Sequence, residues 1–161
     1  MKKLPTANID SIEMETIGNG KGFSAKVGRL TKLLNMQELG CGVVILEPGE
    51  KAWPYHLHYG IEEMFFVLSG EGSIRYDNET YPIKEGDVIH TPTGEGTAHQ
   101  IINTSSSPLK YLAISSHKSP ELCYYPDSGK YGMYAQNSDG SWKTFLTHES
   151  SEKQYYDGEE Q

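Results

Sequence analysis

The segment GEKAWPYHLHYGIEEMFFVLSG, residues 49–70, carries the strongest indication of fold and chemistry in the sequence. His56 and His58 are separated by one residue, so on a strand both imidazoles point to the same face, about 7 Å apart along the backbone. Glu63 follows five residues later and shares strand parity with Phe65. The segment therefore predicts strands that direct imidazole, carboxylate and apolar side chains toward one side.

A third imidazole comes from the segment GDVIHTPTGEGTAHQIIN, residues 86–103. It contains His99, 41 residues after His58, within another predicted strand. Three imidazoles and one carboxylate suit divalent zinc, iron, manganese, nickel or cobalt. Judged from the residues alone, there is an alternative: the His-x-His pair lies on the surface and His99 is an ordinary strand residue.

Turn-forming clusters divide the middle of the chain into short apolar segments. Examples are Glu47–Glu50, Ser69–Gly72 and Asp77–Glu79. The segments recur about every eight to twelve residues without long helical periodicity, which predicts an all-β sandwich or barrel of antiparallel strands. The segment Arg29–Leu39 fits either a short helix or a strand, because its leucines have helical spacing while Thr31 and nearby glycines do not.

The spacing of both segments resembles the two motifs of the cupin superfamily. The matching patterns are Gly49-x6-His56-x-His58-x4-Glu63-x6-Gly70 and Gly86-x5-Pro92-x-Gly94-x4-His99-x3-Asn103. Two offsets depart from the commonest pattern: six residues precede His56, and four separate Gly94 from His99. A subgroup of small single-domain cupins has this wider second motif. The segment Tyr125-Pro126-Asp127-Ser128-Gly129-Lys130 also resembles that subgroup, whose members are sometimes labelled sugar-phosphate isomerases.

This resemblance implies a double-stranded β-helix, a jelly-roll barrel, with one divalent metal ion inside it. The implied ligands are His56, His58, Glu63 and His99, and the implied ion is zinc, iron, manganese or nickel. The domain organisation expected is an N-terminal arm over residues 1–24, a barrel over 25–135 and a C-terminal extension over 136–161.

Three further residues are candidates for a substrate pocket beside the ion. Phe65 and Val67 would form an apolar wall, as small-molecule pockets usually have. His90 shares strand parity with Val88, so its side chain could point into the barrel as a catalytic acid–base group and substrate contact. It could equally point outward.

Charge and composition argue against several classes of partner. The chain has 161 residues with 14 basic and 22 acidic side chains, a net charge of −8. Such a surface repels phosphate backbones and anionic lipids, so no nucleic-acid or membrane partner is expected. The two cysteines and the absence of a hydrophobic leader predict a cytoplasmic protein with reduced thiols.

These observations favour a metal-dependent enzyme that acts on a small oxygenated substrate, as an isomerase or a dioxygenase. The alternatives are a non-catalytic module that binds a sugar or small acid, and a protein in which the metal is structural. The scarcity of arginine argues against a phosphosugar, because Arg29 and Arg75 are the two arginines of the chain.

The flanks of the barrel carry more apolar side chains than a monomer usually exposes. They are Leu30, Leu33, Leu34, Met133, Tyr134, Trp142, Phe145, Tyr155 and Tyr156. This surplus predicts a two-fold homodimer in which the flanks cover a neighbouring sheet. The alternative is that the flanks fold back onto their own barrel.

Overall fold

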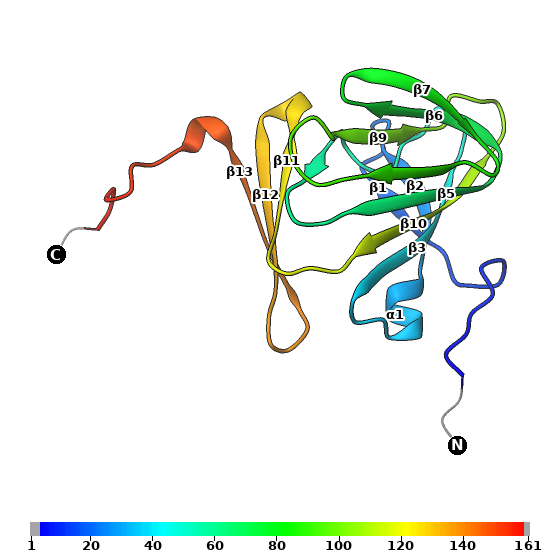
Figure 1. The fold of residues 1–161 in the computed structure, drawn as a ribbon, viewed down its shortest axis with the longest axis horizontal. Helices are drawn as coiled ribbons and strands as arrows, with labels where there is room; N and C mark the ends of the chain where they lie inside the picture. The colour runs from blue at the N-terminus through cyan, green and yellow to red at the C-terminus, as the bar shows by residue number, and fades with distance from the viewer. Residues whose placement is uncertain (1–3, 160–161) are drawn as a thin grey trace.

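The computed structural model describes residues 4–159, which fold mainly into short β-strands (Figure 1). The strands are β1 (Glu15–Gly18), β2 (Ser24–Arg29), β3 (Leu39–Leu46), β4 (Leu57–His58), β5 (Glu63–Ser69), β6 (Glu71–Tyr76), β7 (Glu79–Lys84), β8 (Val88–Thr91), β9 (His99–Ile102), β10 (Leu109–Ser116), β11 (Glu121–Tyr125), β12 (Lys130–Gln136) and β13 (Trp142–His148). The helical segments are α1 (Leu30–Leu34), η1 (Pro126–Ser128) and η2 (Glu149–Ser151). Within this described range, no helix has the length and apolar character needed to cross a membrane.

Two antiparallel sheets form the barrel. The larger has the strand order β1-β2-β3-β10-β5-β8, and the smaller has the order β7-β6-β9. Their facing sides enclose one hydrophobic core. The larger sheet contributes Ala25, Val27, Val44, Leu46, Phe65, Val67, Leu109 and Tyr111, and the smaller contributes Ile74, Ile83 and Ile101. The predicted all-β, double-stranded β-helical architecture is confirmed.

Strand β5 illustrates how the alternation of the sequence produces these layers. Phe65 and Val67 are buried in the core, whereas Met64 on the opposite face is 37% exposed. Glu63 starts the strand on the same side as Phe65 and Val67, and Glu62 before it is exposed. The shared face predicted for Glu63, Phe65 and Val67 is therefore confirmed.

The N-terminal region adds a strand to the larger sheet. β1 pairs antiparallel with β2, from Glu15 opposite Val27 to Gly18 opposite Ser24. Part of the expected arm over residues 1–24 thus belongs to the barrel sheet. The segment after β2 takes the helical alternative, because α1 forms there and ends at Asn35 in the left-handed conformation.

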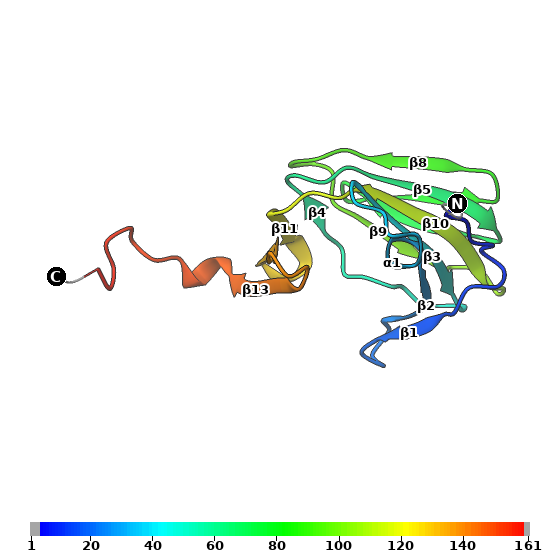
Figure 2. The same cartoon turned by 90° about the horizontal axis from the view of Figure 1, so that it is seen from below.

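The C-terminal region forms a separate sheet beside the barrel. Its order is β13-β12-β11-β4, and it extends away from the barrel together with the tail that follows it (Figures 1 and 2). The expected boundary at residue 135 lies within β12, which pairs with β13 over seven residues. The division into 1–24, 25–135 and 136–161 stays a prediction, and its ends at 1–3 and 160–161 lie outside the described residues.

Candidate metal centre

Three separate segments bring the four predicted ligands to one end of the barrel. His58 belongs to β4, Glu63 starts β5, and His99 starts β9. His56 lies just before β4 and pairs with His99 through two backbone hydrogen bonds, from His56 N–H to His99 O (3.2 Å) and from His99 N–H to His56 O (2.8 Å). This bridge fixes the separation of two imidazoles whose positions in the chain are far apart.

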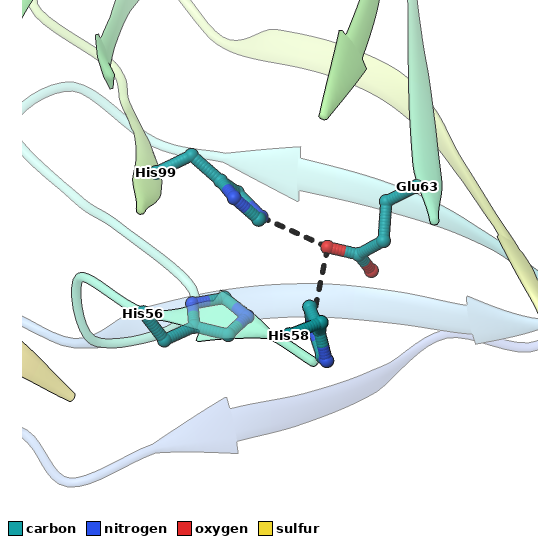
Figure 3. A group of neighbouring side chains, drawn as sticks. All are labelled: His56, His58, Glu63 and His99. Atoms are coloured by element: carbon teal, nitrogen blue, oxygen red, sulfur yellow. Dashed lines mark hydrogen bonds and ion pairs between the residues drawn. The ribbon is translucent and has the colours of Figure 1, made fainter. Parts of the chain in front are cut away.

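The Glu63 carboxylate lies at the centre of the cluster, between two of the imidazoles (Figure 3). Its Oε2 is 2.9 Å from His99 Nε2 and 3.4 Å from His58 Nε2. The imidazole of His56 lies beside them, with ring centroids 4.9 Å from His58 and 4.7 Å from His99. Each residue offers one ligand atom, and the four atoms lie within 4.8 Å of one another. Two donors on opposite sides of one ion are separated by about twice a bond length of roughly 2.0–2.3 Å, so this spread is close to what a single ion requires.

Each imidazole has an acceptor at its Nδ1 atom. The Nδ1 atoms of His56 and His99 lie 2.8 Å from the carbonyl of Pro54 and 3.1 Å from that of Thr97, respectively. That of His58 lies 3.1 Å from a carboxylate oxygen of Glu121. Protons held at Nδ1 leave the Nε2 lone pairs free for a metal.

A buried nitrogen of His58 without a hydrogen-bond partner indicates whether these residues are suited to bind a metal. Its Nε2 is buried and has no hydrogen-bond partner among residues 4–159. Burying a polar atom without a partner is unfavourable by roughly 1–3 kcal/mol. A metal ion satisfies such an atom, so the three imidazoles and the carboxylate fit a divalent transition metal.

The protonation equilibria of the cluster are strongly perturbed. Burial, followed by the charges of His99 and His58, lowers the pKa of His56 to about 4. For Glu63, burial alone would raise the pKa, but the contacts of its carboxylate with the imidazoles of His58 and His99 outweigh burial and hold the pKa well below its usual range. At neutral pH His56 is therefore neutral and Glu63 ionised, the states in which each binds a metal.

A cavity of about 1,070 Å³ opens at the cluster. All four candidate ligands line it, together with Phe65 and Tyr111. The Phe65 ring lies 5.6 Å from the His99 ring, so the expected apolar wall is present there. Val67 does not line the cavity: it is fully buried in the core, two residues further along β5. The expectation of Val67 as a pocket residue is therefore wrong, because each step of two residues moves about 7 Å along a strand.

His90 lies outside the cavity, and the expectation of an inward catalytic histidine is wrong. It is exposed on β8 and pairs with Met64, which is also exposed. Val88, with the same parity, is 63% exposed, while Thr91 on the opposite face is buried. The apolar Val88 suggested an inward face, but β8 is an edge strand, whose apolar residues need not face the core.

Glu121 and Cys123 approach the cluster from β11 and were not predicted. Glu121 Oε1 is 3.1 Å and Cys123 Sγ 3.2 Å from His58 Nδ1. Both residues are buried. They lie more than 60 positions after His58 and belong to neither motif. The one available signal was the alternation in Glu121-Leu122-Cys123-Tyr124, which places Glu121 and Cys123 on one face.

A family model described as the cupin domain matches residues 42–115, the range that contains all four candidate ligands. The chain therefore contains a cupin domain. Among solved cupin structures, a protein from Acidithiobacillus ferrooxidans, provisionally named a sugar phosphate isomerase, superimposes with a TM-score of 0.78 at 26% identity, over 90% of each chain. A sugar phosphate isomerase from Silicibacter pomeroyi superimposes with a TM-score of 0.75 at 25% identity, over 95% of this chain and 98% of that one.

A curated relative of this cupin carries a different name. The oxalate-binding protein of Thermotoga maritima is 39% identical over 69 residues, which are 43% of this chain and 54% of the relative. This cupin spans about half the length of the curated relatives with which it shares 39% identity. The similar proteins therefore agree on the fold and carry names that refer to different small oxygenated molecules.

Proposed function

We propose that this cupin binds one divalent transition-metal ion through His56, His58, Glu63 and His99 and acts on a small oxygenated substrate. The observation that carries the proposal is the convergence of four donor atoms, within 4.8 Å of one another, at a cavity. Isomerisation and dioxygenation are the two reactions that such a site supports.

When bound, the ion supplies a Lewis acid that polarises a substrate oxygen, or, as iron, a site for dioxygen chemistry. The residues of the chain have complementary roles. His56, His58, Glu63 and His99 would hold the ion where a substrate in the cavity could reach it, and Phe65 and Tyr111 provide an apolar wall that limits access of water.

The charge of the cavity supports an anionic substrate. Arg29, Lys32 and Lys118 line the cavity in a chain whose net charge is −8. Basic side chains that line the same cavity as a divalent ion attract carboxylate or phosphate groups. The oxalate-binding relative is named for a dicarboxylate, and the two isomerases for sugar phosphates.

Of the basic residues nearer the motifs, Arg75 is engaged elsewhere. It makes a two-oxygen contact with Asp127, at 2.9 and 2.7 Å, and its guanidinium lies 3.6 Å from the centroid of the Tyr55 ring. The cationic groups for a substrate are therefore those at the cavity, and they include a single arginine, Arg29, which also pairs with Glu15.

A non-catalytic binding protein is the second candidate. Two observations favour it: His90 is outside the cavity, so the expected acid–base group is missing there, and a relative is named for oxalate binding. In this case the ion anchors a small acid without turnover.

Elemental analysis of protein purified without added metal tests the proposal. We expect about one equivalent of a divalent transition metal, and a His99→Ala variant that has lost it. The metal-loaded protein is then assayed for oxygen uptake, for isomerisation of sugar phosphates and, by calorimetry, for oxalate binding. Oxygen uptake identifies a dioxygenase, isomerisation an isomerase, and saturable binding without turnover the second candidate. A protein that takes up no transition metal contradicts both.

We also propose a cytoplasmic location, on the basis of two unpaired cysteines, Cys41 and Cys123.

A further inference from the structure

The geometry points to Glu121 as a positioning residue that orients His58 and strengthens its binding to a metal. This inference rests on the metal site proposed above and adds a fifth residue to it, one that does not itself bind the ion. Glu121 contacts Nδ1 of His58, on the opposite side of the ring from the Nε2 atom that faces Glu63.

The pairing of β4 with β11 holds this contact in place. Cys123 lies opposite His58 in the ladder, and the N–H of Tyr59 donates to the carbonyl of Leu122 at 2.9 Å. Glu121 comes two residues before Cys123 and therefore shares its face. Its carboxylate thus reaches His58 from a backbone that is hydrogen-bonded to the histidine's own strand.

The Glu121 side chain is 3% exposed, so its charge requires compensation. Oε1 lies 3.1 Å from His58 Nδ1 and accepts from the N–H of Gly60 at 3.4 Å, while Oε2 has no partner among residues 4–159. No lysine or arginine of that range forms an ion pair with this carboxylate. Glu121 and Glu63 thus place two carboxylates on either side of the His58 ring, an arrangement that favours a cation there.

His58 differs in this respect from the other two imidazoles. The Nδ1 atoms of His56 and His99 face neutral backbone carbonyls, whereas that of His58 faces a carboxylate. A carboxylate fixes the ring orientation and makes Nε2 a stronger donor than a carbonyl does. Glu121 therefore contributes to metal affinity through His58.

Cys123 provides an alternative role for the same carboxylate. His58, Glu121 and Cys123 each offer an atom, and these atoms lie within 4.8 Å of one another. If a second ion were bound there, Glu121 would be its ligand rather than a positioning residue. Metal stoichiometry distinguishes the two roles.

The experiment is a Co²⁺ titration of the full chain, followed by the ligand-field absorption of the ion. We expect one ion per chain, and we expect Glu121→Gln to weaken binding roughly ten- to hundredfold while the absorption spectrum keeps its shape. Glu149→Gln is the matched control, because it removes the same charge from an exposed residue that contacts Tyr124. Its affinity for Co²⁺ should equal that of the wild type.

Gly60→Ala provides a second variant that retains the carboxylate. A Cβ atom at position 60 would lie 2.6 Å from Glu121 Oε2, so the carboxylate must move. We expect weaker Co²⁺ binding in this variant as well. In the wild type, ¹⁵N NMR should show that Nδ1 of His58 carries a proton, with or without Zn²⁺, a readout that needs no variant to fold.

Three results would overturn the inference: equal Co²⁺ affinity in wild type and Glu121→Gln, a second ion lost in that variant, or an unprotonated His58 Nδ1. Failure of the proposed function gives a different result, namely a wild type that binds no Co²⁺. The protonation state of Nδ1 in the metal-free protein then still tests the contact between Glu121 and His58.

Discussion

The barrel and the C-terminal sheet are both built from short antiparallel strands, yet they bury their apolar residues to very different extents. Leu46 and Leu109 in the barrel are fully buried, whereas Phe145 and Leu146 on β13 are 53% and 54% exposed. The two barrel sheets cover each other, while β12 and β13 extend beyond them (Figure 1). The hydrophobic core is therefore closed by the two barrel sheets, whereas β13 exposes apolar side chains of the kind that usually pack against another surface.

We propose that this other molecule is a second copy of the chain. The tail continues the exposed surface of β13, since Tyr155 and Tyr156 are 87% and 79% exposed (Figure 2). A two-fold arrangement covers both copies with the same contact. The predicted homodimer thus stays a prediction, as does the alternative in which the flanks fold back onto their own barrel.

The largest expected effect concerns the metal, which we assign to the barrel. His99→Ala removes one of four donors and should lower the affinity for Co²⁺ by roughly a hundredfold or more, because even partners of ligands contribute ten- to hundredfold. The barrel should remain folded, since its core is aliphatic and aromatic. Metal analysis and circular dichroism measure the two effects. The control is His90→Ala, an exposed histidine of the same barrel, which should retain full metal content. Loss of metal in both variants would contradict the assignment.

Removal of β13 and the tail that follows it tests the other region. Deleting residues 141–161 takes away β13 and the tyrosines, so light scattering should change from twice the chain mass of 18.0 kDa toward a monomer. Metal content should stay the same, because all four ligands lie before residue 100. A full chain that scatters as a monomer at high concentration would refute the dimer.

The barrel and most of its candidate metal site were predictable from the sequence, because they depend on local patterns. The barrel ligands lie in two local motifs, and the parity of Glu63 and Phe65 follows from the alternation of a strand. The orientation of His90 and the position of Glu121 could not be predicted in this way. The orientation of His90 depends on which face of an edge strand meets the core, and the position of Glu121 depends on β11 pairing with a strand more than 60 residues earlier. Both are tertiary facts that local patterns do not encode.

A pair of leucines sharpens the comparison of stability. Leu109→Ala in the barrel should reduce the free energy of unfolding by about 2–5 kcal/mol, because it leaves a cavity at a fully buried site. Leu146→Ala on β13 should change it by less than about 0.5 kcal/mol in dilute solution, where the exposed side chain has little to lose. Urea denaturation gives both values. Equal destabilisation in dilute protein would show that β13 packs against its own chain.

The smallest expected difference separates two glycines with nearly equal backbone angles. Gly70 in the barrel has φ 85° and Gly140 in the β12–β13 turn has φ 82°, so alanine should be strained at either position by about 1–2 kcal/mol. A Cβ atom at Gly70 would lie 2.4 Å from the carbonyl oxygen of Pro108, whereas one at Gly140 would meet nothing within 4 Å. Gly70→Ala should therefore lower the free energy of unfolding by about 1–3 kcal/mol more than Gly140→Ala, because it adds overpacking to the same strain. Thermal unfolding of the two variants measures the difference. If the two variants were equally destabilised, the close packing around Gly70 would make no contribution to the free energy of unfolding. That result would contradict the contrast between a tightly packed barrel and an open C-terminal sheet.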